Sequence, residues 1–215
     1  MKNTSTYHKG QAVPLNRDNI DTDQIIPKQF LKSIKKSGFG PNLFDAWRYE
    51  DEGFPGQDTS ERKINKEFIL NREKFINSDI LISKKNFGCG SSREHAVWSL
   101  MDFGFKVVIA ESFADIFYNN CFNNGLLPIA VSEHEISTLL DLSNKRKEIE
   151  IDLQNQIIFV EDNEIAHFEI DPFRKKCILE GLYEIGLSLT HSSEIKEFEK
   201  KHYLKSPWIF NKDNN

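Results

Sequence analysis

The sequence predicts an α/β fold organised around a parallel sheet. Between residues 80 and 130, short apolar runs with β-branched residues alternate with segments of helical apolar spacing, which is typical of βαβ units. From residue 148 to residue 160, apolar residues recur in period two on either side of Gln154–Asn155, which predicts an antiparallel hairpin. We therefore expect parallel strands first and an antiparallel ribbon after them.

The segment 28–58 comes before the alternating region and has irregular apolar spacing. It contains six glycines and prolines at positions 38, 40, 41, 53, 55 and 56, which favour turns over regular elements. We expect a long loop with at most short helical pieces. A loop of this length in a compact domain more often has a function than not.

The alternating region divides into three strands and two helices. Ala96, Leu100 and Phe103 recur at helical spacing, and Gly125 separates the second helix from the last strand. The expected strands are Ile80–Ser83, Lys106–Ala110 and Leu127–Ala130, and the expected helices are Ser92–Phe103 and Phe113–Phe122.

After the hairpin, Asn163–Ile170 is expected to extend the ribbon. Helices are predicted at Phe173–Leu182 and Ser193–Tyr203, with Ser193 as the N-cap of the second helix. We expect residues 1–215 to form a single domain, with a peripheral tail from about residue 204 to residue 215.

Composition and charge bear on the partners. The 215 residues carry a net charge of −5, which argues against a nucleic-acid surface or an anionic membrane as partner. No apolar run reaches the roughly 18 residues of a membrane span, and the first ten residues lack the apolar core of a secretory signal. We expect a cytoplasmic protein.

The three cysteines are Cys89, Cys121 and Cys177. They are widely spaced and odd in number, and no pair has the Cys-x-x-Cys spacing of a zinc or iron–sulfur site. We expect no metal ligands and no cofactor bound by this chain alone.

The glycine-rich turn before the first predicted helix is the most informative segment. Gly88 and Gly90 permit backbone angles that other residues avoid, and Ser91 and Ser92 follow where a helix should begin. Donors at a helix N-terminus favour an anion, and Arg93 can grip a carboxylate in two places. This combination suits removal of a proton from a carbon next to a carboxylate. Ser91 would be the base, with its deprotonated form stabilised by fixed hydrogen-bond donors.

Two other interpretations of this turn stay open. Either serine could simply cap the helix, with Glu94 supporting the cap. The turn could also bind a phosphate, although its spacing does not match the Walker pattern and no dinucleotide fingerprint is present.

Three ordered motifs carry a resemblance to a known family. GCGSSREHA at Gly88–Ala96, NIDTDQIIP at Asn19–Pro27 and ESFADIFYNNCFNNGLLPI at Glu111–Ile129 resemble the swivelling β/β/α domain of the aconitase superfamily. PKQFLK, together with GFGPNLFDAWRY at Gly38–Tyr49, is similar to the bacterial small subunits of 3-isopropylmalate dehydratase. The resemblance runs from about Pro14 to about Leu189.

The resemblance implies a hydro-lyase that is active only as a heteromer with a large subunit. That subunit would carry a [4Fe–4S] cluster whose open iron acts as a Lewis acid. The reaction would isomerise 2-isopropylmalate to 3-isopropylmalate in leucine biosynthesis, one of the branched-chain amino-acid pathways. By motif match, Ser91 would be the base, and Ser92 and Arg93 would hold a carboxylate of this hydroxy-dicarboxylic acid.

The resemblance also implies roles around the loop 28–58, which would face the substrate. Leu31 would meet the variable arm of the substrate, a selection worth about 1–3 kcal/mol. Lys32 departs from the apolar residue of archaeal isopropylmalate enzymes, and a cation there suits an acidic arm or simple surface exposure. The substrate of a related homoaconitase or methylmalate-type dehydratase therefore stays open, as does a non-catalytic binding or regulatory module of the same fold.

Supporting roles are expected for residues near the turn. Asp21, Thr22 and Asp23 could bind a metal, but we favour a brace for the serine turn. Glu94 is expected to support the turn as well, and His95 is expected to be a structural hydrogen-bonding histidine.

Overall fold

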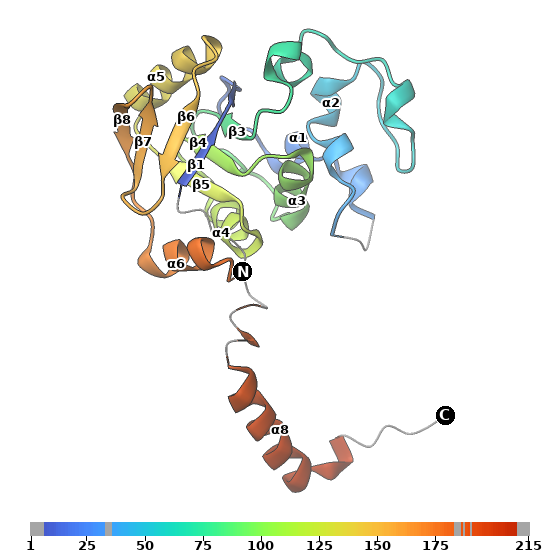
Figure 1. Cartoon of the computed structure of the whole chain (residues 1–215). Coiled ribbons are helices and arrows are strands. Elements are labelled where there is room, and N and C mark those ends of the chain that lie inside the picture. Colours follow the sequence, from blue (N-terminus) through green and yellow to red (C-terminus); the bar gives the residue numbers. More distant parts are fainter. Residues whose placement is uncertain (1–6, 33–35, 183–185, 187, 190, 210–215) are drawn as a thin grey trace.

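Two four-stranded sheets form the body of the protein (Figure 1). The computed structural model describes residues 7–32, 36–182, 186, 188–189 and 191–209. The parallel sheet has the order β2-β3-β4-β5 and the antiparallel sheet the order β1-β6-β7-β8, so the predicted α/β class is confirmed. The strands are β1 Tyr7–Gly10, β2 Ala12–Pro14, β3 Ile80–Ile82, β4 Val107–Ala110, β5 Leu127–Ala130, β6 Ile149–Asp152, β7 Ile157–Val160 and β8 Asn163–His167.

Helices cover the parallel sheet and follow the ribbon. The α-helices are α1 Thr22–Ile25, α2 Asp45–Arg48, α3 Glu94–Phe103, α4 Asp115–Asn124, α5 Glu133–Asn144, α6 Pro172–Glu180 and α8 Ser192–Lys205. Short 3-10 turns occur at Lys28–Lys32, Gly40–Asn42, Thr59–Glu61, Ile69–Asn71, Glu73–Phe75 and Pro207–Ile209. None of the described helices is long and apolar enough to cross a membrane.

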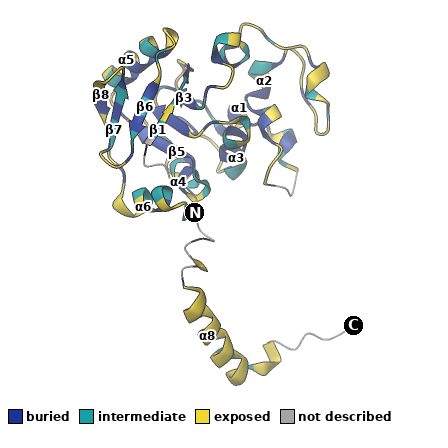
Figure 2. Ribbon diagram, in the orientation of Figure 1, coloured by how far each residue is buried: buried dark blue, intermediate teal, exposed yellow. Residues whose placement is uncertain are grey.

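The parallel sheet is buried on both faces (Figure 2). In β3, Leu81 packs in a cluster with residues of α3 and α4, whereas Ile80 and Ile82 pack in a second cluster with α5 and the antiparallel sheet. Side chains alternate along a strand, so continuous apolar runs are needed where both faces are covered. A ligand-binding site on this sheet would therefore have to form at one of its edges.

The sequence predicted the strands β3 to β8 but missed β1, β2 and α5. Helix α5 begins with a capping box: the Ser132 hydroxyl accepts from the Glu135 amide at 3.4 Å, and the Glu135 carboxylate accepts from the Ser132 amide at 2.7 Å. Ser-x-x-Glu followed by apolar Ile136, Leu139 and Leu140 is a recognisable helix start. That signal was present in the sequence.

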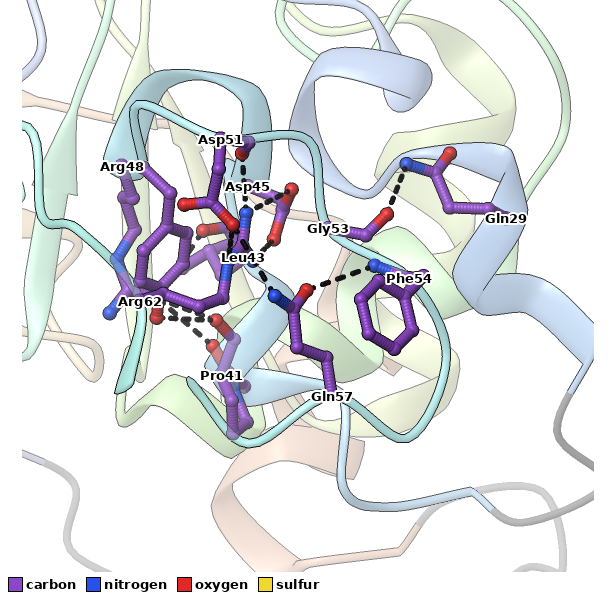
Figure 3. A network of polar contacts seen from close by, with 12 residues as sticks. Gln29, Pro41, Leu43, Asp45, Arg48, Asp51, Gly53, Phe54, Gln57 and Arg62 are labelled. Atoms are coloured by element: carbon purple, nitrogen blue, oxygen red, sulfur yellow. Dashed lines mark hydrogen bonds and ion pairs between the residues drawn. The ribbon is translucent and has the colours of Figure 1, made fainter. Parts of the chain in front are cut away.

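Over its described residues, 28–32 and 36–58, the loop contains only short helical pieces, as predicted. A buried arginine anchors it (Figure 3): Arg62 pairs with Asp45 and donates to Asp51, and its side chain is 1% exposed. The Asp45 side chain is 2% exposed. A buried guanidinium needs such partners, so this pair ties the loop to the segment that follows it.

The C-terminal helix α8 differs from the prediction. Its N-cap is His191, which makes no side-chain capping bond, so the assignment of Ser193 as the cap is wrong. The helix continues to Lys205, and none of its residues is buried (Figure 2). Residues 210–215 of the predicted tail lie outside the described residues. A single domain over residues 1–215 stays a prediction.

Candidate functional site

Three segments meet at the carboxyl edge of the parallel sheet, where α/β proteins usually bind ligands. The chain after β2 runs beside the chain after β3: the Thr22 amide donates to the Cys89 carbonyl at 2.9 Å, and the Gly88 amide donates to the Ile20 carbonyl at 2.8 Å. The segment after β4 supplies Phe117. The three motifs of the sequence are therefore neighbours in space.

Both glycines of the turn have left-handed backbone angles. Gly88 has φ 76° and Gly90 has φ 90°, which favours glycine over other residues. A Cβ at Gly88 would overlap the Phe117 ring, whereas a Cβ at Gly90 would lie 3.4 Å from the Asp21 Cβ. Gly88 is thus required for packing and for conformation, and Gly90 mainly for conformation.

Helix α3 begins at Glu94, so the predicted start at Ser92 is wrong. Arg93 is the N-cap, has an extended backbone and makes no side-chain capping bond. The Ser91 carbonyl accepts the Thr22 hydroxyl at 2.8 Å and is held outside the helix. Neither serine caps α3, so the capping interpretation does not hold.

The two serines and Arg93 line one pocket of about 250 Å³. Ser91 and Ser92 are exposed, and Arg93 is half-buried. The other lining residues come from α1, the glycine turn and the start of α4: Thr22, Gly88, Gly90, Ala114, Asp115, Ile116 and Phe117. The predicted grouping of hydroxyls and guanidinium is thus present on an open surface.

Arg93 forms an ion pair with Asp23 of α1. The Arg93 side chain is 16% exposed and that of Asp23 is 51% exposed. Asp23 also lines a neighbouring pocket of about 570 Å³, together with Lys28 and Glu50. The ion pair fixes one edge of the guanidinium between the two pockets.

The other two residues of the proposed brace also have partners. Asp21 caps α1, with its carboxylate accepting from the Gln24 amide at 2.7 Å, and Thr22 holds the Ser91 carbonyl. Within the described residues, no group of three His, Cys, Asp or Glu side chains could hold a metal ion. The geometry favours the brace over a metal site.

The residues that open α3 face away from the pocket into other contacts. The Glu94 carboxylate accepts from the Asn124 amide at 2.8 Å. The His95 ring contacts the rings of Phe39 and Trp98, at centroid distances of 5.1 and 4.7 Å. Burial, aided by the nearby Arg93, lowers the pKa of His95. His95 is thus a packed aromatic residue, and no pattern in the sequence pointed to Asn124.

Leu31 and Lys32 do not reach the serine pocket. Leu31 is partly buried against the core, and Lys32 is exposed at the end of a 3-10 turn. Neither residue lines the pocket that holds Ser91. The next residue of that loop, Ser33, lies outside the described residues.

The three cysteines are buried or partly buried. Cys121 and Cys177 are buried, and Cys89 is partly buried. Burial raises the pKa of all three thiols, most strongly that of Cys121, and Asp21 adds to the effect at Cys89. A raised pKa favours the protonated thiol over the reactive thiolate.

Comparison with known proteins identifies the family. A family model described as the aconitase C-terminal domain matches residues 2–134. A second model, described as the C-terminal domain of the 3-isopropylmalate dehydratase small subunit, matches residues 184–212.

A curated relative and a solved structure agree with these matches. The 3-isopropylmalate dehydratase small subunit of Polaromonas sp. (strain JS666 / ATCC BAA-500) is 53% identical over 206 residues, which are 95% of each chain. The crystal structure of 3-isopropylmalate dehydratase from Methanocaldococcus jannaschii has a TM-score of 0.62 at 28% identity, covering 90% of this chain and 99% of the other. The chain belongs to the aconitase C-terminal domain family and, within it, to the small subunits of 3-isopropylmalate dehydratase.

Proposed function

We propose that this chain delivers the base and a carboxylate clamp to a cytoplasmic hydro-lyase that converts 2-isopropylmalate to 3-isopropylmalate in leucine biosynthesis. The observation that carries the proposal is one pocket at the carboxyl edge of the parallel sheet, lined by Ser91, Ser92 and Arg93. Dehydration and rehydration need a base beside the carbon and a cation for the carboxylate.

Ser91 is the proposed base. A serine hydroxyl is a weak base in water. It becomes an effective base only as the deprotonated alkoxide, which fixed positive groups nearby must stabilise. Arg93 and the N-terminal end of α3 lie two and three positions further along the chain. The bond from Thr22 to the Ser91 carbonyl holds the backbone in place, which favours a preorganised position for the side chain.

Ser92 and Arg93 are the proposed carboxylate ligands. A guanidinium has five N–H donors in a planar fork, and Asp23 accepts from one terminal nitrogen, Nη1. The remaining edge can bind a carboxylate in two places. Asp23 would then orient Arg93, with Asp21 and Thr22 bracing the turn. Glu94 and His95 would hold the start of α3 through their contacts with other elements.

A large subunit is the proposed partner and would hold the [4Fe–4S] cluster. When bound, such a cluster supplies a Lewis acid for the substrate hydroxyl and carboxylate. This chain would close over it with the serine pocket. Contacts of Leu31 and Lys32 with the substrate arm stay a prediction for that closed complex.

The test is turnover of 2-isopropylmalate by the complex, reconstituted without oxygen from this chain and its large subunit. We expect the isolated chain to be colourless and inactive. In the complex, Ser91→Ala should abolish formation of the unsaturated acid while the absorption of the cluster remains.

Ser92→Ala is the matched control, and we expect it to raise KM more than it lowers kcat. Substantial turnover by the Ser91→Ala complex would remove Ser91 as the base. Loss of the cluster signal in that variant would point to a structural effect instead.

The exposed cation Lys32 favours one second candidate, a related dehydratase whose substrate has an acidic arm, such as homoaconitate. A series of substrates with apolar and acidic arms distinguishes the two. Higher kcat/KM for the acidic arm, lost in Lys32→Met, would favour the second candidate.

A further inference from the structure

The side-chain amide of Asn124, the last residue of α4, forms hydrogen bonds through each of its polar groups. Its Nδ2 donates to the Glu94 carboxylate at 2.8 Å and to the Asn120 carbonyl at 2.9 Å, and its Oδ1 accepts from the Trp98 indole N–H at 2.8 Å. A side-chain amide has two N–H donors and one carbonyl acceptor. All three groups are engaged, so the orientation of this amide is fixed.

The partner of Asn124 borders the proposed carboxylate clamp. Glu94 follows Arg93 directly in the sequence, yet the ion pair of Arg93 is formed with Asp23. The Glu94 carboxylate instead lies on the amide of Asn124. The carboxylate that pairs with Arg93 and the carboxylate that follows Arg93 in the sequence thus have separate partners.

The separation matters because guanidinium–carboxylate bonds are the strongest hydrogen bonds available in such a site. Without the amide, the carboxylate of Glu94 would be free to turn toward the adjacent Arg93. It would then occupy donors that a substrate carboxylate needs. The Glu94 carboxylate would compete with the substrate carboxylate for Arg93. Its effective concentration would be high, because it belongs to the next residue of the same chain.

We propose that Asn124 is a positioning residue, which keeps Glu94 turned toward α4 and leaves Arg93 open to an anionic substrate. The inference rests on the proposed function, since it concerns the same clamp. It predicts an effect on substrate affinity through Glu94 and no effect on proton transfer at Ser91. A merely structural role for Asn124 would not depend on the charge of Glu94.

A double-mutant cycle in the reconstituted complex tests this dependence, with 2-isopropylmalate as substrate. Asn124→Ala should raise KM about tenfold, with kcat within about twofold of wild type. In the Glu94→Gln background, the same substitution should raise KM by less than about twofold, because a neutral amide competes poorly for Arg93. Asn123→Ala, at the exposed neighbouring position, is the matched control and should leave KM unchanged.

An equal rise of KM in both backgrounds, or a fall of kcat at unchanged KM, would overturn the inference. If the wild-type complex does not turn over 2-isopropylmalate, the proposed function fails on its own. A crystal structure of the Asn124→Ala chain then decides the inference separately. The Glu94 carboxylate should be bonded to Arg93, and a carboxylate still turned toward α4 would contradict the inference.

Discussion

At the residue scale, Arg93 has to serve two anions. Asp23 already pairs with it, and the substrate carboxylate is the second anion in the proposed site. A planar fork can bind one anion with two parallel hydrogen bonds while it holds another at a different nitrogen, whereas a lysine ammonium is a compact point charge without that geometry.

Arg93→Lys should therefore raise KM for 2-isopropylmalate by about tenfold or more, since one lost charge-assisted hydrogen bond is worth roughly 1.5–3 kcal/mol. Steady-state kinetics of the reconstituted complex measure the effect. The thermal midpoint of the isolated chain is the control, because the charge at this position is kept. An unchanged KM would show that Arg93 does not clamp the substrate in two places.

The residues of the candidate site were predictable to different degrees. Ser91, Ser92 and Arg93 are adjacent in the sequence, so their grouping follows from one motif. The bond from Thr22 to Ser91 joins residues 69 positions apart, and that from Asn124 to Glu94 joins residues 30 positions apart. Such pairs depend on how the elements pack, which composition and local spacing do not specify.

At the scale of the element, the glycine turn offers a matched pair of substitutions. Gly88→Ala forces a left-handed angle on alanine, which costs about 1–2 kcal/mol, and overlaps Phe117, which costs a further ~1–3 kcal/mol. Gly90→Ala meets only the conformational cost, because its Cβ has room. Urea unfolding of both variants should give the larger loss of stability for Gly88→Ala, and equal losses would contradict the packing argument.

The strands of the alternating region and of the hairpin after it were predicted, whereas β1, β2 and α5 were missed. The strands β3, β4 and β5 are apolar runs buried on both faces, which makes them visible in the sequence. β1, with the sequence YHKG, has two polar residues in its middle, and β2, with the sequence AVP, ends in a proline. Neither stands out as an apolar run, although β1 is as long as β4 and β2 is as long as β3. The start of α3 was placed two residues early, because the hydroxyl of Thr22 holds the Ser91 carbonyl outside the helix.

At the scale of the whole molecule, α8 contributes little to the core. It buries no residue, whereas α5 buries Ile136, Leu139 and Leu140. A chain that ends at Leu182 should keep its thermal midpoint within about 2–4 °C, the shift that roughly 1 kcal/mol gives at this size.

Ile136→Ala in the full chain is the contrasting control, expected to cost about 2–5 kcal/mol. Calorimetry of the three proteins measures the difference. A midpoint for the shortened chain as low as that of Ile136→Ala would mean that α8 stabilises the body.

The serine pocket is built from stretches that follow three different strands, so no short fragment of the chain can possess it. A chain whose parallel sheet has not yet formed lacks this pocket. Binding of any molecule at this pocket would therefore be coupled to the pairing of those three strands, and would stabilise the folded sheet by mass action.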